Sequence, residues 1–307
     1  MSKRFLLIFI MSMVSSAFAE DKIIITVNQF VNHIALDDAY NGMNKALKDR
    51  HVIPERAELI VSNAQGNISN SVQISKHHAS LKPKFMVAIA TPAAQTNLKA
   101  MDPQHSTLAF VAVTDPAAAN LIREKALIGV SDNPPIKELL SIARKVFTDK
   151  KIIGVIYNSG EINSVKMLET LESEAPKFGF EIKKISINNS SDIKMAMNKL
   201  IGMVDIIYLP QDNTIVSALD SIVNISKMAK KPIIANDPSL VKKGAFLALG
   251  TNYFKSGEQL GNMIADIIEG KEIPESITSS KIRELKINEG VEKELGIRVP
   301  KEIKNEK

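Results

Sequence analysis

Short apolar runs alternate with longer amphipathic stretches along almost the whole chain, and this alternation constrains the fold more than any other feature of the sequence. The runs are rich in isoleucine and valine, as in IIITV at 23–27 and IIGVIY at 152–157. The stretches between them have the length and apolar spacing of helices, as in IKELLSIARKVF at 136–147. Strands that alternate with helices form βαβ units around a parallel sheet. The pattern therefore predicts an α/β fold.

The number of runs favours two sheets over one. Nine strands are predicted, at 23–27, 58–62, 85–90, 108–113, 152–157, 180–187, 205–209, 232–235 and 246–250. An apolar strand followed by proline, an amide residue and an amphipathic helix occurs twice, at 85–101 and at 204–222. Two consecutive prolines follow Asn133 and restart the chain as a helix. We therefore expect two Rossmann-like lobes of similar construction, with the main boundary near residue 133.

The first 19 residues have the order of a secretory signal peptide. Lys3 and Arg4 precede an apolar block at 5–14, and residues 17–19 form an A-x-A cleavage site. About ten apolar residues are too few for the roughly twenty that span a bilayer, so cleavage after Ala19 is favoured over a retained anchor helix. The chain has no cysteine, and therefore neither a lipid-acceptor thiol nor a disulfide. We expect a mature periplasmic chain without direct membrane insertion.

The charge of the chain does not indicate a nucleic-acid partner. The formal net charge is +5 and the isoelectric point is near 9.1. The lysines are scattered along the chain, as on a solvated surface, and export separates the protein from nucleic acid.

The stretch after the third predicted strand predicts an anion site. Thr91 is expected at the N-cap of a helix and Pro92 at its first position. Ala93 and Ala94 then leave the N–H groups of the first turn uncovered, and Gln95 follows. A helix start carries roughly half a positive charge, which suits a carboxylate. An ordinary capped helix is the alternative for this element taken alone.

Short polar residues and acids follow the other predicted strands too. They are Thr114 and Asp115; Asn158, Glu161, Asn163 and Ser164; Asp212 and Asn213; and Asn236 and Asp237. Each group alone is typical of a turn. Ligands of open α/β sheets bind beyond the carboxyl ends of the strands, so the groups together indicate one cleft with several carboxylates and an anion-accepting helix start. Such a cleft suits a zwitterion.

Several motifs resemble those of the periplasmic substrate-binding proteins of ABC transporters, in the family that includes the tryptophan-binding type. The most specific are IATPAAQ at 89–95, VTDP at 113–116 and YNSGEINS at 157–164. The resemblance extends in order over nearly the whole mature chain. It implies a type I periplasmic-binding fold, in which two lobes joined by a hinge of three crossings close around a small ligand.

The resemblance also implies lobe boundaries and partners. It places 20–133 and about 247–280 in one lobe, and 134–246 and about 281–307 in the other. It implies a monomeric, non-enzymatic protein without metal or cofactor, which captures an amino acid and delivers it to a membrane permease whose ATPase is a separate subunit. Tryptophan, phenylalanine and tyrosine are the favoured ligands.

The positions of the family's cleft carry over to particular residues of this chain. Thr91, Ala93, Ala94 and Gln95 would cradle the ligand carboxylate, and Asp115 and Asp237 would bind its ammonium, because charge-assisted hydrogen bonds are about twice as strong as neutral ones. The remaining expected site residues are Gln29, Phe30, His33, Thr114, Tyr157, Asn158, Glu161, Asn163, Ser164, Asp212, Asn213, Asn236 and Tyr253. The three aromatic residues would form a wall, with a place in the core as the alternative, and His33 is equally compatible with a turn.

The sequence disfavours some other functions and leaves others as alternatives. An enzyme with two cleft acids is disfavoured because the chain lacks a GxSxG elbow, a Walker A loop and an HExxH motif. The adjacent His77 and His78 point about 100° apart on a helix and are expected to be a surface pair. A DNA-binding regulator is disfavoured as well, because it would need a helix-turn-helix before the first strand, where the sequence predicts only a signal peptide. A branched-chain amino acid or nucleoside as ligand, and a sensor rather than a transporter as output, stay as alternatives.

Overall fold

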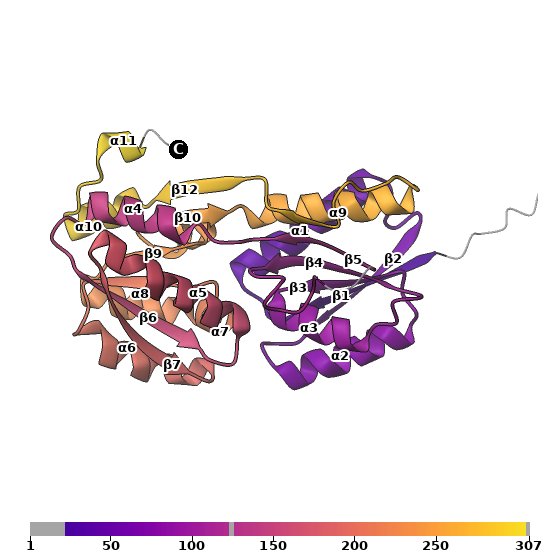
Figure 1. The fold of residues 1–307 in the computed structure, drawn as a ribbon, viewed down its shortest axis with the longest axis horizontal. Helices are drawn as coiled ribbons and strands as arrows, with labels where there is room; N and C mark the ends of the chain where they lie inside the picture. The colour runs from indigo at the N-terminus through magenta and orange to yellow at the C-terminus, as the bar shows by residue number, and fades with distance from the viewer. Residues whose placement is uncertain (1–21, 123–125, 305–307) are drawn as a thin grey trace, which may run out of the picture.

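The computed structural model describes residues 22–122 and 126–304. The predicted signal peptide at 1–19 lies outside the described residues. Two lobes lie side by side, each built on one six-stranded sheet with helices on both faces (Figure 1). The predicted α/β class with two Rossmann-like lobes is confirmed.

The sheet of the first lobe has the order β11-β5-β4-β3-β1-β2, and all its pairs are parallel. Its strands are β1 (Ile23–Gln29), β2 (Ala57–Asn63), β3 (Phe85–Ile89), β4 (Thr107–Val113), β5 (Leu127–Ser131) and β11 (Ile277–Ser279). Its helices are α1 (Ile34–Asp49), α2 (Ile68–Ser80), α3 (Thr91–Ala100) and α9 (Tyr253–Ile268). The central strand β3 is buried along its whole length, as expected for a parallel strand covered on both faces.

The sheet of the second lobe has the order β12-β10-β9-β8-β6-β7, in which only β12 is antiparallel to its neighbour. Its strands are β6 (Ile152–Asn158), β7 (Glu181–Ile187), β8 (Ile206–Leu209), β9 (Ile233–Ala235), β10 (Leu247–Thr251) and β12 (Arg283–Ile287). Its α-helices are α4 (Ile136–Val146), α5 (Ile162–Glu174), α6 (Ile193–Ile201), α7 (Asn213–Ser217), α8 (Leu219–Met228), α10 (Glu289–Leu295) and α11 (Lys301–Lys304). Three 3₁₀ helices complete it: η1 (Ala175–Phe178), η2 (Ser190–Asp192) and η3 (Pro238–Lys243).

The chain crosses between the lobes three times, after β5, after β10 and after β11. The predicted boundary at about residue 247 is wrong, because β10 pairs with β9 and β12 in the second sheet. The second crossing therefore follows Thr251 and leads directly into α9. This crossing places Tyr253, the first residue of α9, between the two lobes.

Helices α1 and α9 pack with their backbones in close approach, and glycines make this possible. A Cβ atom on Gly257 would lie 2.0 Å from the carbonyl oxygen of Ala39, and one on Gly42 would lie 1.9 Å from that of Phe254. Any side chain at either position would force the helices apart. The close packing fixes α9, and therefore Tyr253 at its start, against the first lobe.

A network of buried polar side chains joins β1, α2 and α3 within the first lobe. The Asn28 amide donates to Ser71 Oγ (3.0 Å) and Ser75 Oγ (3.1 Å), and Asn97 donates to the carbonyl oxygen of Val87. His78 belongs to the same region: it is buried, and its Nε2 lies 3.0 Å from Ser62 Oγ. The expectation of a surface histidine pair is therefore wrong for His78. Burial lowers the pKa of this imidazole to about 4.

Candidate functional site

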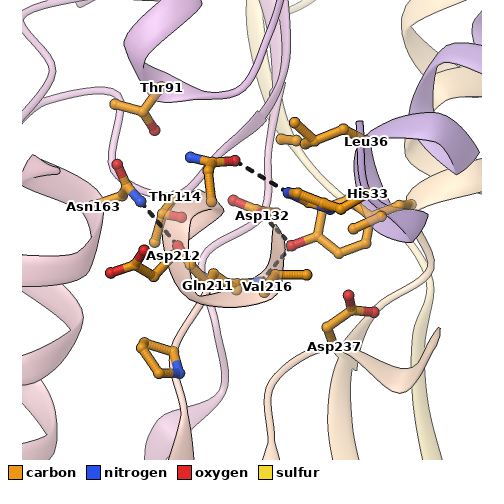
Figure 2. Close-up of a pocket in the computed structure, with 15 residues that line it drawn as sticks. His33, Leu36, Thr91, Thr114, Asp132, Asn163, Gln211, Asp212, Val216 and Asp237 are labelled. Carbon is orange, nitrogen blue, oxygen red and sulfur yellow. Dashed lines mark hydrogen bonds between the residues drawn. The ribbon is translucent and has the colours of Figure 1, made fainter. Parts of the chain in front are cut away.

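A small cavity lies between the lobes, where the carboxyl ends of strands from both sheets meet (Figure 2). Its volume is about 30 Å³. Its lining residues are His33, Ala35, Leu36, Thr91, Ala112, Thr114, Asp132, Asn163, Pro210, Gln211, Asp212, Asn213, Val216, Asp237 and Tyr253. A space of this size holds a water or two, so a larger ligand requires the lobes to move apart.

Two alanines with unusual backbone angles shape the wall on the first lobe. Ala90, which precedes α3, has φ +88°, and Ala112 near the end of β4 has φ +58°. The register between β4 and β5 shifts between Val111 and Val113, so Ala112 forms a bulge. Positive φ is costly for a residue with a Cβ, and residues of this kind cluster at ligand sites. The bulge directs the end of β4, including Thr114, to the cavity.

The start of α3 differs by one residue from the prediction. Ala90 occupies the N-cap and Thr91 is the first helical residue, so Thr91 does not cap the helix. The Ala94 N–H donates to the carbonyl oxygen of Ala90 (3.1 Å), and Pro92 has no N–H. In the first turn, the N–H groups of Thr91 and Ala93 are thus the ones left for an anion. Thr91 also lines the cavity with its side chain (Figure 2).

Asp132, Tyr253 and Gln211 form a chain of hydrogen bonds across the cavity (Figure 2). The Tyr253 hydroxyl donates to Asp132 Oδ2 (2.5 Å), and Gln211 Nε2 donates to the Tyr253 oxygen (2.7 Å). Asp132 follows β5 in the first lobe, and Gln211 follows β8 in the second. Burial raises the pKa of the Asp132 carboxyl to about 6, although the bond from Tyr253 opposes this shift.

Asp237 follows β9 and lies on the second-lobe side of the cavity. Its Oδ1 accepts hydrogen bonds from the Ser239 N–H (2.9 Å) and the Ser239 hydroxyl (2.7 Å), so the side chain caps η3. Burial raises the pKa of this carboxyl to about 6, with a smaller contribution from the nearby negative charges of Asp38 and Asp132. A cationic ligand group in the cavity would therefore stabilise the ionised forms of both Asp132 and Asp237.

Glu161 is buried, but its carboxylate is fully used by the second lobe itself. Its Oε2 accepts from the Asn213 side-chain amide (2.6 Å) and its Oε1 from the Thr214 hydroxyl (2.8 Å). Backbone N–H groups of both partners add further bonds, at 3.1 Å and 3.0 Å. Glu161 therefore stabilises the start of α7 and has no acceptor capacity directed to a ligand.

Asp212 plays a similar structural part next to Glu161. Its Oδ2 accepts from the Asn158 N–H and the Ser164 hydroxyl, both at 2.6 Å, and its Oδ1 accepts from the Ile215 N–H at 3.0 Å. Burial and the neighbouring Glu161 carboxylate raise the pKa of the Asp212 carboxyl. Together these bonds tie the start of α5 to the start of α7, and they hold Asn163 at the cavity.

Four buried polar atoms of the cavity lining have no hydrogen-bond partner among residues 22–122 and 126–304. They are His33 Nδ1, Asp132 Oδ1, Asn163 Oδ1 and Gln211 Oε1. An unpaired buried polar atom costs about 1–3 kcal/mol, and folded proteins contain few of them. Four around one cavity identify it as a place where a ligand completes the hydrogen bonding.

Direct hydrogen bonds between the lobes hold the cavity closed. His33 Nε2 lies 3.3 Å from Asn213 Oδ1, and the bond from Gln211 to Tyr253 also joins the second lobe to the first. Burial lowers the pKa of His33, so its imidazole is neutral at pH 7. These contacts are made by cavity-lining side chains, so they have to break before a ligand can enter the cavity.

The cavity brings together eight of the predicted site residues. They are His33, Thr91, Thr114, Asn163, Asp212, Asn213, Asp237 and Tyr253. The structure does not place the others in its lining: Gln29, Phe30, Ala93, Ala94, Gln95, Asp115, Tyr157, Asn158, Glu161, Ser164 and Asn236. Phe30, Asn158 and Glu161 line a larger groove, which is formed by residues of both lobes and shares Asn213 with the cavity. Asp115 lines a different hollow, beside the first crossing, together with Lys166.

Two of the residues outside the cavity have clear structural parts. The Gln29 side chain donates to Asp37 Oδ1 (2.7 Å) in the first turn of α1. The Asn236 side chain accepts from the Tyr208 hydroxyl (2.6 Å) in β8 and donates to the carbonyl oxygen of Leu249 in β10. Gln29 thus links the end of β1 to the start of α1, and Asn236 links the end of β9 to β8 and β10.

Asp132 and Gln211 line the cavity but were not among the site residues expected from the sequence. Asp132 directly follows β5, a strand that was not among the nine predicted ones. Gln211 lies between Pro210 and Asp212. It is neutral, and the neighbouring acid Asp212 was selected in its place. The apolar lining residues Ala35, Leu36, Ala112, Pro210 and Val216 were also missed, because small and aliphatic side chains carry no local signal of a ligand site.

Within residues 22–122 and 126–304, no group of three or more His, Asp or Glu side chains is arranged to hold a metal ion. No helix in this part of the chain is long and apolar enough to cross a membrane.

The chain belongs to the family of ABC transporter substrate-binding proteins, because the family's model matches residues 24–307. A tyrosine-binding protein from Clostridioides difficile (strain R20291) is 32% identical over 278 residues, which cover 88% of this chain and 80% of that protein. The resemblance expected from the motifs at 89–95, 113–116 and 157–164 is confirmed, and so is the type I periplasmic-binding fold class.

Two solved structures show which arrangement of the lobes this chain resembles. An ABC domain in complex with L-Trp from Streptococcus pneumoniae is 27% identical, with a TM-score of 0.87 over 93% of this chain and 98% of that one. The ligand-free, open structure of a substrate-binding protein with adhesive properties from Clostridium difficile is 30% identical, with a TM-score of 0.67 over 91% and 96%. The lobes of this chain are thus arranged more like those of the L-Trp complex.

Proposed function

We propose that this protein captures an aromatic α-amino acid between its lobes and delivers it to an ABC permease. The observation that carries the proposal is the set of four unpartnered polar atoms around the cavity, close to two carboxyl groups and a helix start. A zwitterion supplies both the positive and the negative group that these elements favour. The relatives named above as binding tyrosine and L-Trp support an aromatic side chain.

The ligand's ammonium binds Asp132 and Asp237 in this proposal, with Asn163 Oδ1 as a third acceptor. Asp132 takes the place that the sequence assigned to Asp115, because Asp132 lines the cavity and has a free oxygen. The ligand's carboxylate binds at the start of α3, where the Thr91 side chain and the N–H groups of Thr91 and Ala93 are available. Leu36, Val216 and the neighbouring alanines contact the side chain of the ligand.

Ligand capture requires an open state, since a closed cavity of about 30 Å³ is far below the roughly 300–1,000 Å³ of ordinary ligand pockets. In the open state the bonds from His33 to Asn213 and from Gln211 to Tyr253 are broken. The ligand then supplies contacts to both lobes and favours closure. We propose that the closed, loaded monomer docks on the permease in the periplasm, and that a separate ATPase subunit hydrolyses ATP.

The test is a thermal-shift screen of residues 20–307, freed of bound ligand by unfolding and refolding, against the twenty amino acids, nucleosides and sugars. A ligand at a hundred times its dissociation constant adds about 2.7 kcal/mol of stability. We expect the melting temperature to rise by several degrees with tryptophan, tyrosine or phenylalanine. A rise with a nucleoside or sugar alone would refute the amino-acid site, and binding without uptake defects in a deletion strain would refute the transport part.

The affinity for an amino acid should fall in acid. In the ligand-free closed form the carboxyls of Asp132 and Asp237 have pKa values of about 6, and a bound ammonium lowers them. Binding therefore releases protons near pH 6, and affinity decreases as the pH falls through that value. Between pH 7 and pH 5 the expected loss is at least about tenfold. Calorimetry at pH 6 in two buffers of different ionisation heat measures the released protons; equal heats in both would contradict this prediction.

A further inference from the structure

The orientation of the Gln211 side-chain amide is fixed by its neighbours. Asp132 has no proton to donate when ionised, so the Tyr253 hydroxyl must donate to Asp132 Oδ2. The Tyr253 oxygen can then only accept, and the group that donates to it is Gln211 Nε2, at 2.7 Å. The other end of the amide, Oε1, is left as a buried acceptor without a partner (Figure 2).

The backbone of Gln211 is held as firmly as its side chain. Its carbonyl oxygen accepts from Asn163 Nδ2 (2.9 Å), and its N–H donates to Met167 Sδ (3.2 Å). The Oε1 atom is therefore presented at the cavity by contacts with both lobes. A positioned, unpaired acceptor of this kind discriminates strongly between ligands with and without a matching donor.

The unpartnered ring nitrogen of His33, Nδ1, is also a hydrogen-bond acceptor. The Asn213 amide donates through Nδ2 to Glu161 Oε2, so Asn213 Oδ1 faces His33 Nε2 and must accept from it. The lowered pKa keeps His33 neutral, and its Nδ1 is then a bare acceptor. All four unpartnered atoms are thus acceptors: His33 Nδ1, Asp132 Oδ1, Asn163 Oδ1 and Gln211 Oε1.

In the proposed function the three N–H groups of the ammonium are used by Asp132, Asp237 and Asn163 Oδ1, which leaves Gln211 Oε1 and His33 Nδ1 as acceptors without a donor. The ammonium carries the positive charge and is drawn to the buried carboxylates of Asp132 and Asp237. Gln211 Oε1 is a neutral acceptor on the second lobe and suits a neutral N–H or O–H donor. The donor that pairs with Gln211 Oε1 is therefore expected on the side chain of the ligand.

We propose that Gln211 Oε1 accepts a hydrogen bond from the ring of the ligand and selects aromatic amino acids that carry a ring donor. The indole N–H of tryptophan and the phenol O–H of tyrosine fulfil this condition, whereas phenylalanine does not. The inference rests on the proposed amino-acid function and adds the substrate class. Tyr253 acts as a positioning residue, because its hydroxyl orients the amide.

Isothermal titration calorimetry on residues 20–307 tests the proposal. The ligands are tryptophan, tyrosine and phenylalanine, and two variants are compared with the wild-type protein. Wild-type protein should bind tryptophan or tyrosine at least about tenfold more tightly than phenylalanine. Gln211→Met keeps the length of the side chain without its acceptor. It should weaken binding of the ring-donor ligand about ten- to a hundredfold and binding of phenylalanine less than about threefold. Gln104→Met, in an exposed loop, is the matched control and should change nothing.

The outcomes separate this inference from the proposed function. If no amino acid binds wild-type protein, the proposed function fails. If all three bind with equal affinity, or if Gln211→Met weakens all three equally, the function stands and the ring contact is refuted. A ligand-side measurement does not depend on the folding of a variant: 3-benzothienylalanine, in which sulfur replaces the indole N–H, should bind wild-type protein at least about tenfold more weakly than tryptophan. Equal binding of these two would overturn the proposal.

Discussion

Asp132→Asn is expected to weaken amino-acid binding by roughly 30- to 1,000-fold while leaving the ligand-free protein as stable as before or more stable. Loss of one partner of a buried charge pair costs about 2–4 kcal/mol of binding free energy, which corresponds to this range. The stability of the ligand-free protein should not fall, because asparagine can still accept a hydrogen bond from the Tyr253 hydroxyl. The substitution also removes a buried negative charge whose pKa is raised to about 6. Calorimetry measures the amino-acid affinity, and thermal unfolding at pH 7 measures the stability of the ligand-free protein.

Asp115→Asn is the matched control for this prediction. The Asp115 carboxylate accepts from the Ala118 N–H (2.9 Å) and lines the hollow beside the first crossing, away from the cavity. Its neutralisation should change the affinity by less than about threefold, as expected for a charge that is screened by solvent. A large loss at Asp115 with little change at Asp132 would restore the assignment made from the sequence. It would also remove Asp132 from the site.

The two-lobed fold could be predicted from the sequence because its strands are apolar runs, most of which are largely buried, as in β1, β3, β4, β6, β8, β9 and β10. Each of the nine predicted apolar runs corresponds to a strand of the structure, from β1 to β4 and from β6 to β10. The three missed strands lack a long apolar run, although β5 is buried along its whole length. Leu127–Ser131 has only five residues with Gly129 at its centre, and β11 and β12 are short, partly exposed strands next to the crossings. Their pairing depends on tertiary contacts rather than on their own residues.

The site could be predicted only as far as the ends of recognised strands. Asp132 was missed because its strand was missed. Asp115 was favoured because VTDP looks like a strand end, but the bulge at Ala112 changes which residues after β4 reach the cavity. No local pattern marks an alanine that adopts φ +58°.

Hydrogen-bond saturation is a second property that the sequence does not reveal. Glu161 and Asp132 are both buried acids near strand ends, yet the oxygens of Glu161 are satisfied by α7 whereas Asp132 retains a free one. The difference depends on residues some fifty positions away along the chain. Only the structure distinguishes an acid that holds a helix from an acid that is available to a ligand.

Gly257→Ala should destabilise the protein by about 2–4 kcal/mol, a large effect for one methyl group. Alanine has a better helix propensity than glycine by about 1 kcal/mol, so a substitution in an open helix would stabilise. Here the added Cβ would lie 2.0 Å from the carbonyl oxygen of Ala39, and neither backbone can yield without separating α1 from α9. Urea unfolding should show a lower midpoint, and displacement of Tyr253 at the start of α9 should weaken ligand binding as well.

Gly202→Ala provides the comparison for Gly257→Ala, since both add the same methyl group. A Cβ on Gly202 meets no atom within 4 Å, and its φ of −75° is compatible with alanine. The free energy of unfolding should therefore change by less than about 0.5 kcal/mol or increase slightly. A similar loss for both variants would mean that the close approach of α1 and α9 is not the cause. Normal stability of Gly257→Ala would contradict the helix packing that places Tyr253 between Asp132 and Gln211.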